Sequence, residues 1–347
     1  MREHRLSFMV LAALAVILAP AASAMADIVY DRTIDTAGQH LGGNITNNVL
    51  ITSDGSATDG GVPVKIYGGG LVTVQGDWDF RGQNNFLGGV GSLGTLHVDG
   101  GTATTDNSLI FNGCVSSGVV GESRLNVTGG TFNLVSAYAN QNDSRLYVSQ
   151  TGGFTNAAGT FTVGHGSTQK TNVQAQYVIS GGRAKFGNLT VGNGGSSLTS
   201  ANCGSGRFEV NGLWTVDGVA KAIEIASILR LHHTLAFNFG ATGVTPIDAA
   251  TFVLGTTDGA NPTIELGVLD GLTAGDVAAG TYDLVRLADA WDGSLGDIAL
   301  VAPTGWALQM SDDGTAIQAV VPVIPEPSTM ALLGFGGIMF LSRRWRK

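Results

Sequence analysis

The octapeptide Ser123-Arg124-Leu125-Asn126-Val127-Thr128-Gly129-Gly130 decides the predicted fold class of this 347-residue chain. Apolar and polar side chains alternate in it, so Leu125 and Val127 share one face of a strand and the polar residues share the other. The glycine pair supplies the positive φ angles of a sharp turn. The stretch is therefore typical of a short strand that buries one face and ends in a turn.

This pattern occurs five times along the middle of the chain. Its copies are residues 94–101, 123–130, 144–153 (with two extra residues before the glycine pair), 177–182 and 206–212. The first apolar positions are 96, 125, 146, 177 and 208, so the copies are 29, 21, 31 and 31 residues apart. A second strand is predicted between copies, at 161–164 and 189–192. Because one such unit cannot bury its own apolar face, neighbouring units are expected to stack and share a core.

We therefore predict an all-β fold in which residues 27–218 form a parallel β-solenoid, or β-helix. A β-sandwich built of hairpins is the alternative, since Gly-rich strands about every ten residues also suit that fold. Residues 219–321 predict a β-rich module that caps the solenoid, although 222–231 could form a helix or a pair of strands. The Gly-rich repeats also resemble those of autotransporter-type passenger domains, a resemblance that implies a β-helical body.

The charge and composition of the chain argue against a nucleic-acid partner and in favour of β-structure. The body, residues 27–324, carries 12 basic and 25 acidic side chains, a net charge of −13. Binding to a phosphate backbone depends on clustered Lys and Arg, and no basic stripe occurs, so we expect no nucleic-acid partner. Charged residues make up 13% of the chain, against roughly 25% in ordinary globular proteins. The 52 glycines are about twice the usual share of roughly 7%. This composition favours strands and turns over helices.

The N-terminus has the order of a secretory signal peptide. Arg2 and Arg5 precede the apolar run 8–19, which Pro20 and a series of small residues follow. Two overlapping A-x-A cleavage sites lie at 22–24 and 24–26. We predict that residues 1–26 are removed on export, so that the mature chain starts at Asp27; a start at Met25 is the alternative.

The C-terminus has three parts in series. Pro325-Glu326-Pro327 precedes the apolar run 330–341, and the basic residues Arg343, Arg344, Arg346 and Lys347 follow it. As a helix, the 12 apolar residues would span about 18 Å, which is short for a hydrocarbon core of about 30 Å. The run could still cross a membrane with polar flanks in the interface. The basic end would then stay cytoplasmic.

This tail, residues 322–347, resembles the PEP-CTERM sorting signal of bacterial exported proteins. The resemblance implies that Pro325, Glu326 and Pro327 are the recognition motif. It also implies processing by an exosortase-type membrane protease, with a transient membrane anchor and delivery to the cell surface, envelope or extracellular matrix. A contact with extracellular polysaccharide is implied by the sorting family and not by particular residues.

Two cysteines, Cys114 and Cys203, lie 89 residues apart, or about three repeats. At a strand spacing of about 4.8 Å, they would be about 14 Å apart along a solenoid. A disulfide requires Cα atoms within about 7 Å. We therefore expect no disulfide between them, and a bridge there would count against the solenoid.

Several side chains are candidates for binding. Arg124, Arg145 and Arg207 fall at equivalent repeat positions and could hold an acidic sugar, but a solvated row that discourages edge pairing is the favoured interpretation. In residues 77–79, Asp-Trp-Asp, two carboxylates could bind calcium or the tryptophan could stack on carbohydrate. Alternation favours instead a buried Trp78 between two outward carboxylates.

No catalytic or metal-binding motif is found. His97 and His165 are expected at the surface, and His232-His233 lacks the spacing of a metal site. We predict no catalytic residue, metal or cofactor, and hence a non-enzymatic, exported surface or matrix protein with a structural or adhesive role. The alternative is a carbohydrate-active enzyme, such as a polysaccharide lyase or hydrolase, or a carbohydrate-binding protein. An ice- or crystal-binding face would need a regular Thr array, and the threonines are out of register.

Overall fold

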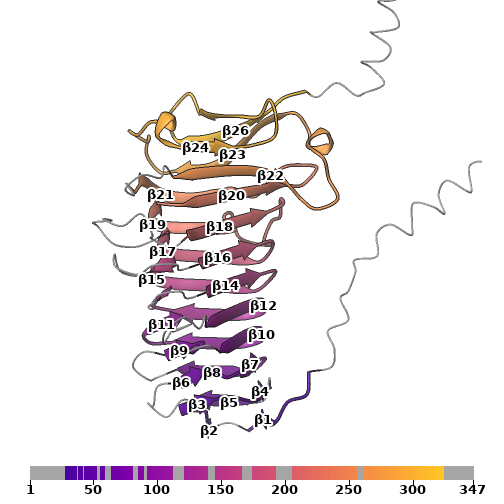
Figure 1. Ribbon diagram of the computed structural model, residues 1–347, viewed down its shortest axis with the longest axis vertical. Coiled ribbons are helices and arrows are strands. Elements are labelled where there is room, and N and C mark those ends of the chain that lie inside the picture. The colour runs from indigo at the N-terminus through magenta and orange to yellow at the C-terminus, as the bar shows by residue number, and fades with distance from the viewer. Residues whose placement is uncertain are drawn as a thin grey trace, which may run out of the picture.

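The computed structural model describes residues 28–36, 38–41, 43–52, 55–58, 64–80, 85–89, 92–111, 121–139, 145–165, 174–192, 205–255 and 262–323. Over these ranges the chain is all-β and contains no α-helix, which confirms the all-β part of the predicted fold. The strands form one large sheet in which most pairings are parallel (Figure 1). Residues 222–231, for which the sequence left helix or strands open, are almost entirely the single strand β19 (Ile223–Leu231).

Three parallel ladders run the length of the structure. The first joins β1 (Arg32–Ile34), β4 (Asn48–Ile51), β7 (Leu71–Val74), the first part of β10 (Leu93–Thr105) and of β12 (Glu122–Leu134), β14 (Arg145–Gln150), β16 (Gln174–Ile179), β18 (Ser205–Asn211), β20 (Thr234–Phe239), β22 (Thr263–Val268) and β24 (Ala299–Val301). Each ladder therefore takes strands from successive stretches of the chain.

The other two ladders are built in the same way. The second joins β2 (Gln39–His40), β5 (Ser56–Thr58), β8 (Asp77–Phe80), the second part of β10 and of β12, the first part of β15 (Phe154–His165), β17 (Arg183–Val191), β19 and β21 (Ile247–Leu254), and finally the end of β23 (Gly280–Leu287). The third joins β3 (Gly43–Ile45), β6 (Val64–Ile66), β9 (Asn85–Leu87), β11 (Ser108–Phe111), β13 (Ser136–Ala139) and the second parts of β15, β17, β19 and β21.

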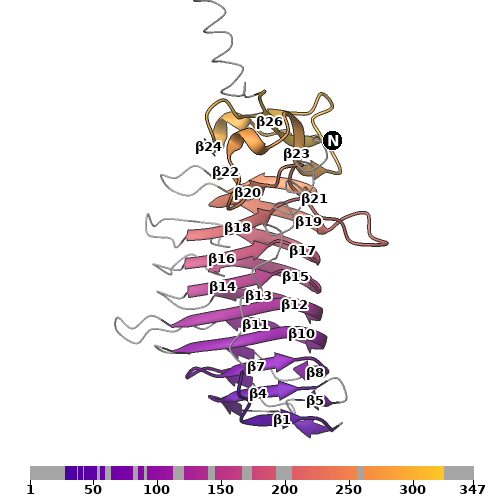
Figure 2. The ribbon, with the colours of Figure 1, turned by 90° about the vertical axis from the view of Figure 1, so that its right-hand side faces the viewer.

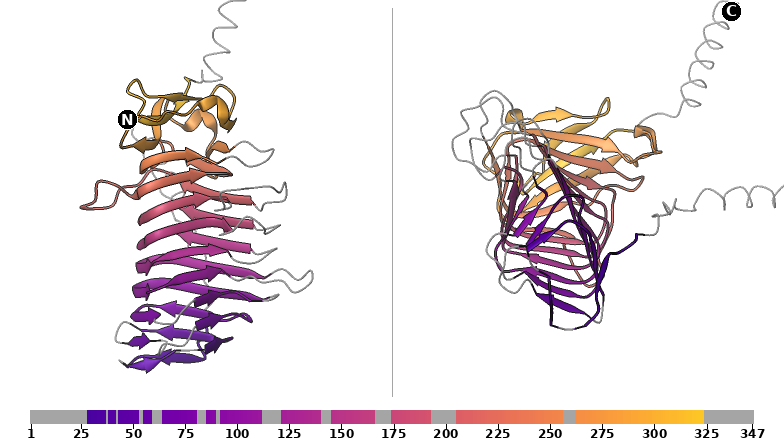
Figure 3. Two further views of the ribbon diagram at one scale, coloured as in Figure 1. Left: turned by 90° about the vertical axis from the view of Figure 1, so that its left-hand side faces the viewer. Right: turned by 60° about the horizontal axis from the view of Figure 1, so that its bottom comes forward.

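The strands stack as layers from one end of the molecule to the other. Figures 1 and 2 show β1 to β3 at one end and β23, β24 and β26 (Ala316–Val321) at the other. Seen towards the end of the stack, the strands border a shared interior (Figure 3). One cluster of buried apolar side chains fills that interior from Ile34 to Val321. The expectation that units pile up around a continuous core agrees with this arrangement.

Antiparallel pairing between the described strands is confined to the C-terminal end. There β26 pairs with β23 and with β25 (Ala307–Met310), beside the 3-10 helices η1 (Ala274–Asp276) and η2 (Leu295–Asp297). Strands before residue 219 pair in parallel with strands after it, because β17 pairs with β19 and β18 pairs with β20. A module boundary at residue 219 stays a prediction, and the change in pairing occurs about 60 residues later, at β23.

The register of the repeats follows the glycine pairs. Leu96 lies opposite Leu125, as predicted, but the partner of Leu125 in the next layer is Val148 and not Leu146. A Cβ on Gly153 would meet the carbonyl oxygen of Gly129 at 2.5 Å, so the glycine turns must stack directly. The two extra residues of the third copy therefore shift its strand by two positions, and the predicted alignment of that copy is wrong.

Several predictions concern residues outside the described ranges. They are the signal peptide 1–26, Cys114 and Cys203, and the motif and apolar run of the tail. Among the residues that are described, the structure contains no helix with the length and hydropathy of a membrane span.

Candidate functional site

A column of polar side chains runs along the outside of the second ladder. Alternate residues of these strands, such as Trp78, Phe132 and Ala184, are fully buried, so the residues between them face outward. The outward column consists of Asp79, Thr104, Asn133, Asn156, Lys185, Glu224, Asp248 and Arg286. After Asp79 it changes along the axis from the hydroxyl and amide groups of Thr104, Asn133 and Asn156 to charged groups.

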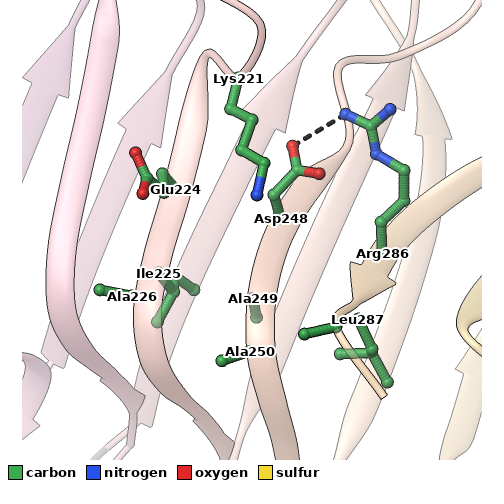
Figure 4. A pocket seen from close by; sticks show the side chains of 10 residues that line it. Lys221, Glu224, Ile225, Ala226, Asp248, Ala249, Ala250, Arg286 and Leu287 are labelled. Carbon is green, nitrogen blue, oxygen red and sulfur yellow. Dashed lines mark hydrogen bonds and ion pairs between the residues drawn. The ribbon is translucent and has the colours of Figure 1, made fainter. Parts of the chain in front are cut away.

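The charged end of this column borders a hollow of about 170 Å³. Four of its lining residues are charged, namely Lys221, Glu224, Asp248 and Arg286 (Figure 4). The other six lining residues are apolar: four alanines, Ala226, Ala249, Ala250 and Ala288, together with Ile225 and Leu287. Strands β19, β21 and β23 supply most of these residues, so their positions depend on the register between three successive layers.

Both carboxylates of the hollow have cationic partners. The Glu224 carboxylate lies 3.4 Å from Arg183 Nη2 and 3.3 Å from Lys185 Nζ. Asp248 is only 8% exposed and accepts a hydrogen bond of 2.8 Å from Arg286 Nη2. Burying a charge without such a partner is costly, which explains why Asp248 is found beside Arg286.

Lys221 differs from the other cations of the hollow. Within the described part of the chain, no carboxylate lies within ion-pair distance of Lys221, while Arg183, Lys185 and Arg286 each have one. Figure 4 shows Lys221 and Arg286 on either side of Asp248. The lining of the hollow carries two cations and two carboxylates, so its own net charge is zero, on a body whose net charge is −13. Because Arg183 and Lys185 already bind Glu224 from beside the hollow, Lys221 is the lining cation without a carboxylate partner among the described residues.

The arginine row predicted from the sequence does not form. In the register of the first ladder, Tyr147 and Gln176 separate Arg124 from Arg207. Arg145 lies two positions away, opposite Glu122. The shift of the third copy causes this difference. Arg124 pairs with Glu122, and Arg207 pairs with Glu209 and Glu265, so these arginines bind carboxylates of the protein itself.

The interpretation of Asp77-Trp78-Asp79 is confirmed. Trp78 is 1% exposed, and its ring centroid lies 3.7 Å from that of Phe80. The carboxylate of Asp77 accepts a hydrogen bond from the Thr102 backbone. Over the described ranges, no group of three or more His, Cys, Asp or Glu residues is arranged to hold a metal ion. This hydrogen bond gives Asp77 a structural role between neighbouring strands.

Two of the histidines that the structure describes are buried. His97 was expected at the surface, and this prediction is wrong: it is 8% exposed, with Nε2 2.9 Å from Thr128 Oγ1 on the neighbouring strand. Burial lowers the pKa of His97, against the nearby charge of Asp99. Burial also lowers the pKa of His232 to about 4. The side chain of His165 lies outside the description.

The comparison with known families concerns the tail alone. Residues 323–347 match the model of the PEP-CTERM protein-sorting motif. The tail is a sorting motif. No curated protein and no solved structure is significantly similar to the chain. The motif implies an exported protein that exosortase sorts. Pro325, Glu326 and Pro327 lie inside the match, and their individual roles stay predictions.

The residues of the hollow could not be identified from the sequence. Its four charged residues belong to no motif and come from three different layers; they are Lys221, Glu224, Asp248 and Arg286. Their neighbourhood depends on how long each layer is, and that length varies along the chain. The sequence would have indicated this site only if the register of the layers had been known. That register aligns four charged residues in one column: Lys185, Glu224, Asp248 and Arg286.

Proposed function

We propose that this protein is a non-enzymatic component of the cell surface or extracellular matrix, displayed as a β-solenoid stalk with a structural or adhesive role. The sorting motif at 323–347 is the observation that carries the proposal. The three parallel ladders around one core support it, because stacked layers give a rigid and elongated body.

The position of the tail sets the orientation of the proposed stalk. The tail follows β26, which lies at the opposite end of the stack from β1 (Figure 1). The first ladder contains eleven strands, so its ten spacings of about 4.8 Å extend over about 48 Å. If the C-terminal end is held at the envelope, the layer of β1, β2 and β3 points away from the cell. The polar column then lies along the side of the stalk.

The proposal includes three partners. An exosortase-type protease would process the tail, the membrane would hold it transiently through residues 330–341 and the basic end, and extracellular polysaccharide would contact the body. Signal-peptide removal before Asp27 would precede these steps. The C-terminal β-rich module would close the solenoid at the end nearest the envelope, since β23, β25 and β26 are found there.

A carbohydrate-active enzyme is the second candidate, because Glu224 and Asp248 lie directly opposite each other on neighbouring strands. Glycoside hydrolysis commonly uses two carboxylates, one as a proton donor and one as a nucleophile or base. In this hollow both carboxylates are engaged in ion pairs, which favours a binding or structural role. Incubating the purified protein with acidic and neutral polysaccharides separates the two candidates. Turnover that disappears in Glu224→Gln and Asp248→Asn would overturn the non-enzymatic proposal.

Sorting is tested by expressing three forms of the chain in the native cell: the complete chain, the chain without 322–347, and a variant with Pro325, Glu326 and Pro327 replaced by alanine. We expect the complete chain at the surface or in the matrix, and both altered forms lost from that fraction. A variant with Ser328 and Thr329 replaced by alanine is the matched control and should sort normally. Mass spectrometry of the surface protein should find a C-terminus without Arg343. An intact Lys347 there would contradict tail processing.

A further inference from the structure

We propose that the hollow bordered by Lys221, Glu224, Asp248 and Arg286 binds a single hexuronate residue of an acidic polysaccharide, with the sugar carboxylate held by Lys221 and Arg286 beside Asp248. This inference rests on the polysaccharide contact in the proposed function and names its chemical class. It concerns the folded body, so it can be tested independently of export.

The two lining cations, Lys221 and Arg286, favour an anionic group in the ligand. Glu224 is shared by Arg183 and Lys185, and Asp248 is bound by Arg286 through one nitrogen, Nη2. Lys221 has no ion-pair partner among the described residues and is exposed. The Arg286 side chain is 42% exposed, so it can donate a further hydrogen bond. A carboxylate held by these two cations would make charge-assisted hydrogen bonds, which are stronger than neutral ones.

The carboxylates of the hollow determine which anion fits. Glu224 and Asp248 can only accept hydrogen bonds when ionised, so the ligand must also carry donors. A hexuronate has one carboxylate and several hydroxyl groups, and can satisfy both kinds of side chain. Inorganic phosphate at neutral pH carries more charge and fewer donors than a hexuronate, so it would meet stronger repulsion from the two carboxylates. A neutral sugar would leave Lys221 without a counter-ion.

The size and floor of the hollow suit one sugar ring. Its volume of about 170 Å³ is below the range of roughly 300–1,000 Å³ found for drug-sized ligands. Four of the six apolar residues that line it are alanines, namely Ala226, Ala249, Ala250 and Ala288. Such small side chains leave a shallow apolar surface against which the C–H face of a pyranose ring can pack. Towards the other end of the stack, the outward column continues through Lys185 to the hydrogen-bonded pair Asn156 and Asn133, and the adjoining residues of a polysaccharide could follow it.

Calorimetric titration of the purified full-length chain tests the inference. The probes are a galacturonate oligosaccharide, a neutral galactose oligosaccharide of equal length, and inorganic phosphate, all at one fixed salt concentration. We expect saturable binding of the galacturonate probe alone. Lys221→Gln should weaken it about tenfold or more, because this variant removes a cation with no structural ion pair. Ala250→Phe should abolish binding by filling the hollow at unchanged charge.

The matched control is Arg145→Gln, which removes one exposed cation from a different ladder and should leave the affinity unchanged. Circular dichroism of each variant verifies that the fold is retained. Absence of galacturonate binding, equal binding of the neutral probe or of phosphate, or an equal loss in Lys221→Gln and Arg145→Gln would each overturn the inference. The sorting experiment is read from cell fractions, so failure of one proposal is distinguishable from failure of the other.

Discussion

Tyr177 donates a hydrogen bond of 2.6 Å to Gln150 Oε1 inside the apolar core, where both residues are fully buried. Gln150 takes the core position that Val127 and Ile179 occupy in the layers on either side. Its amide nitrogen also donates to the backbone carbonyl of Arg183, 2.7 Å away. A polar residue in this column is tolerated because every one of these groups has a partner. Burial raises the pKa of Tyr177, so the phenol keeps its proton and remains a donor.

We predict that Gln150→Leu and Tyr177→Phe each lower the free energy of unfolding by about 1–3 kcal/mol. Tyr177→Phe removes the donor to Gln150 Oε1, and Gln150→Leu removes the acceptor of the Tyr177 hydroxyl and the donor to the Arg183 carbonyl. The double variant should cost less than the sum of the two, by about 1 kcal/mol or more, because both partners are then apolar. Chemical denaturation of the four proteins measures this cycle. Additive losses would show that the two side chains act independently.

The stacked glycine turns predict a strong effect at Gly182. Its φ is +74°, and an added Cβ would lie 2.3 Å from the carbonyl oxygen of Gly152 in the layer below. Gly182→Ala should therefore cost about 3 kcal/mol or more, from backbone strain together with separation of the layers. Gly218→Ala is the control: φ is +71° but nothing lies within 4 Å of the added methyl. It should cost about 1–2 kcal/mol, and equal losses in a thermal melt would contradict the stacking argument.

The sequence contains enough information for the kind of strand and for stacking, but not for register. Alternation around Leu125 and Val127 identifies a strand with one buried face. The turn predicted at Gly129-Gly130 does not end that strand: both glycines lie inside β12, and of the two only Gly130 has a positive φ. In the third copy the first apolar residue and the glycine pair give different alignments, and backbone contact between glycines outweighs the match of Leu146 to Leu125. One apolar side chain can replace another in a core column, whereas a Cβ cannot replace a glycine hydrogen at such a contact.

The hollow was unpredictable for a related reason. Asp248 and Arg286 are 38 residues apart, and they meet only because β21 pairs with β23 after a long excursion through η1. His97 was misjudged because alternation places it on the outer face, yet Thr128 in the next layer contacts its ring. Alternation along one strand says which face a residue occupies. How far that face is covered depends on neighbouring strands and loops.

Two arginines of the first ladder should differ in importance. Arg207 binds Glu209 through Nε at 2.8 Å and Glu265 through both terminal nitrogens, which links β18 to β22 across β20. Arg124 pairs with Glu122 of its own strand, and its side chain is 51% exposed. We expect Arg207→Gln to lower the free energy of unfolding by about 2 kcal/mol and Arg124→Gln by no more than about 0.5 kcal/mol. Denaturant titration at low and at 0.5 M salt measures both; similar losses would show that the interstrand links contribute little.

The burial of His232 should make the free energy of unfolding depend on pH. It is 5% exposed, both ring nitrogens lack partners among the described residues, and burial lowers its pKa from 6.5 to about 4. Below pH 6.5 the unfolded chain therefore binds a proton that the folded chain does not, so the free energy of unfolding should fall as the pH drops from 6.5 to about 4. The expected loss is about 2 kcal/mol.

His232→Leu should flatten this decline, because the side chain at 232 then remains apolar and uncharged in both states. Unfolding by denaturant, measured at half-unit steps from pH 7 to pH 4, gives the two slopes. Asp313 does not confuse the comparison: hydrogen bonds from Ser311 and Thr315 lower its pKa to about 2, so its contribution is present above pH 3.8 and is lost at lower pH. His97 titrates in the same direction as His232 and should leave a residual slope in the variant. A slope equal to that of the original protein would mean that His232 is protonated in the folded state, and that the corner between β19 and β20 opens to water.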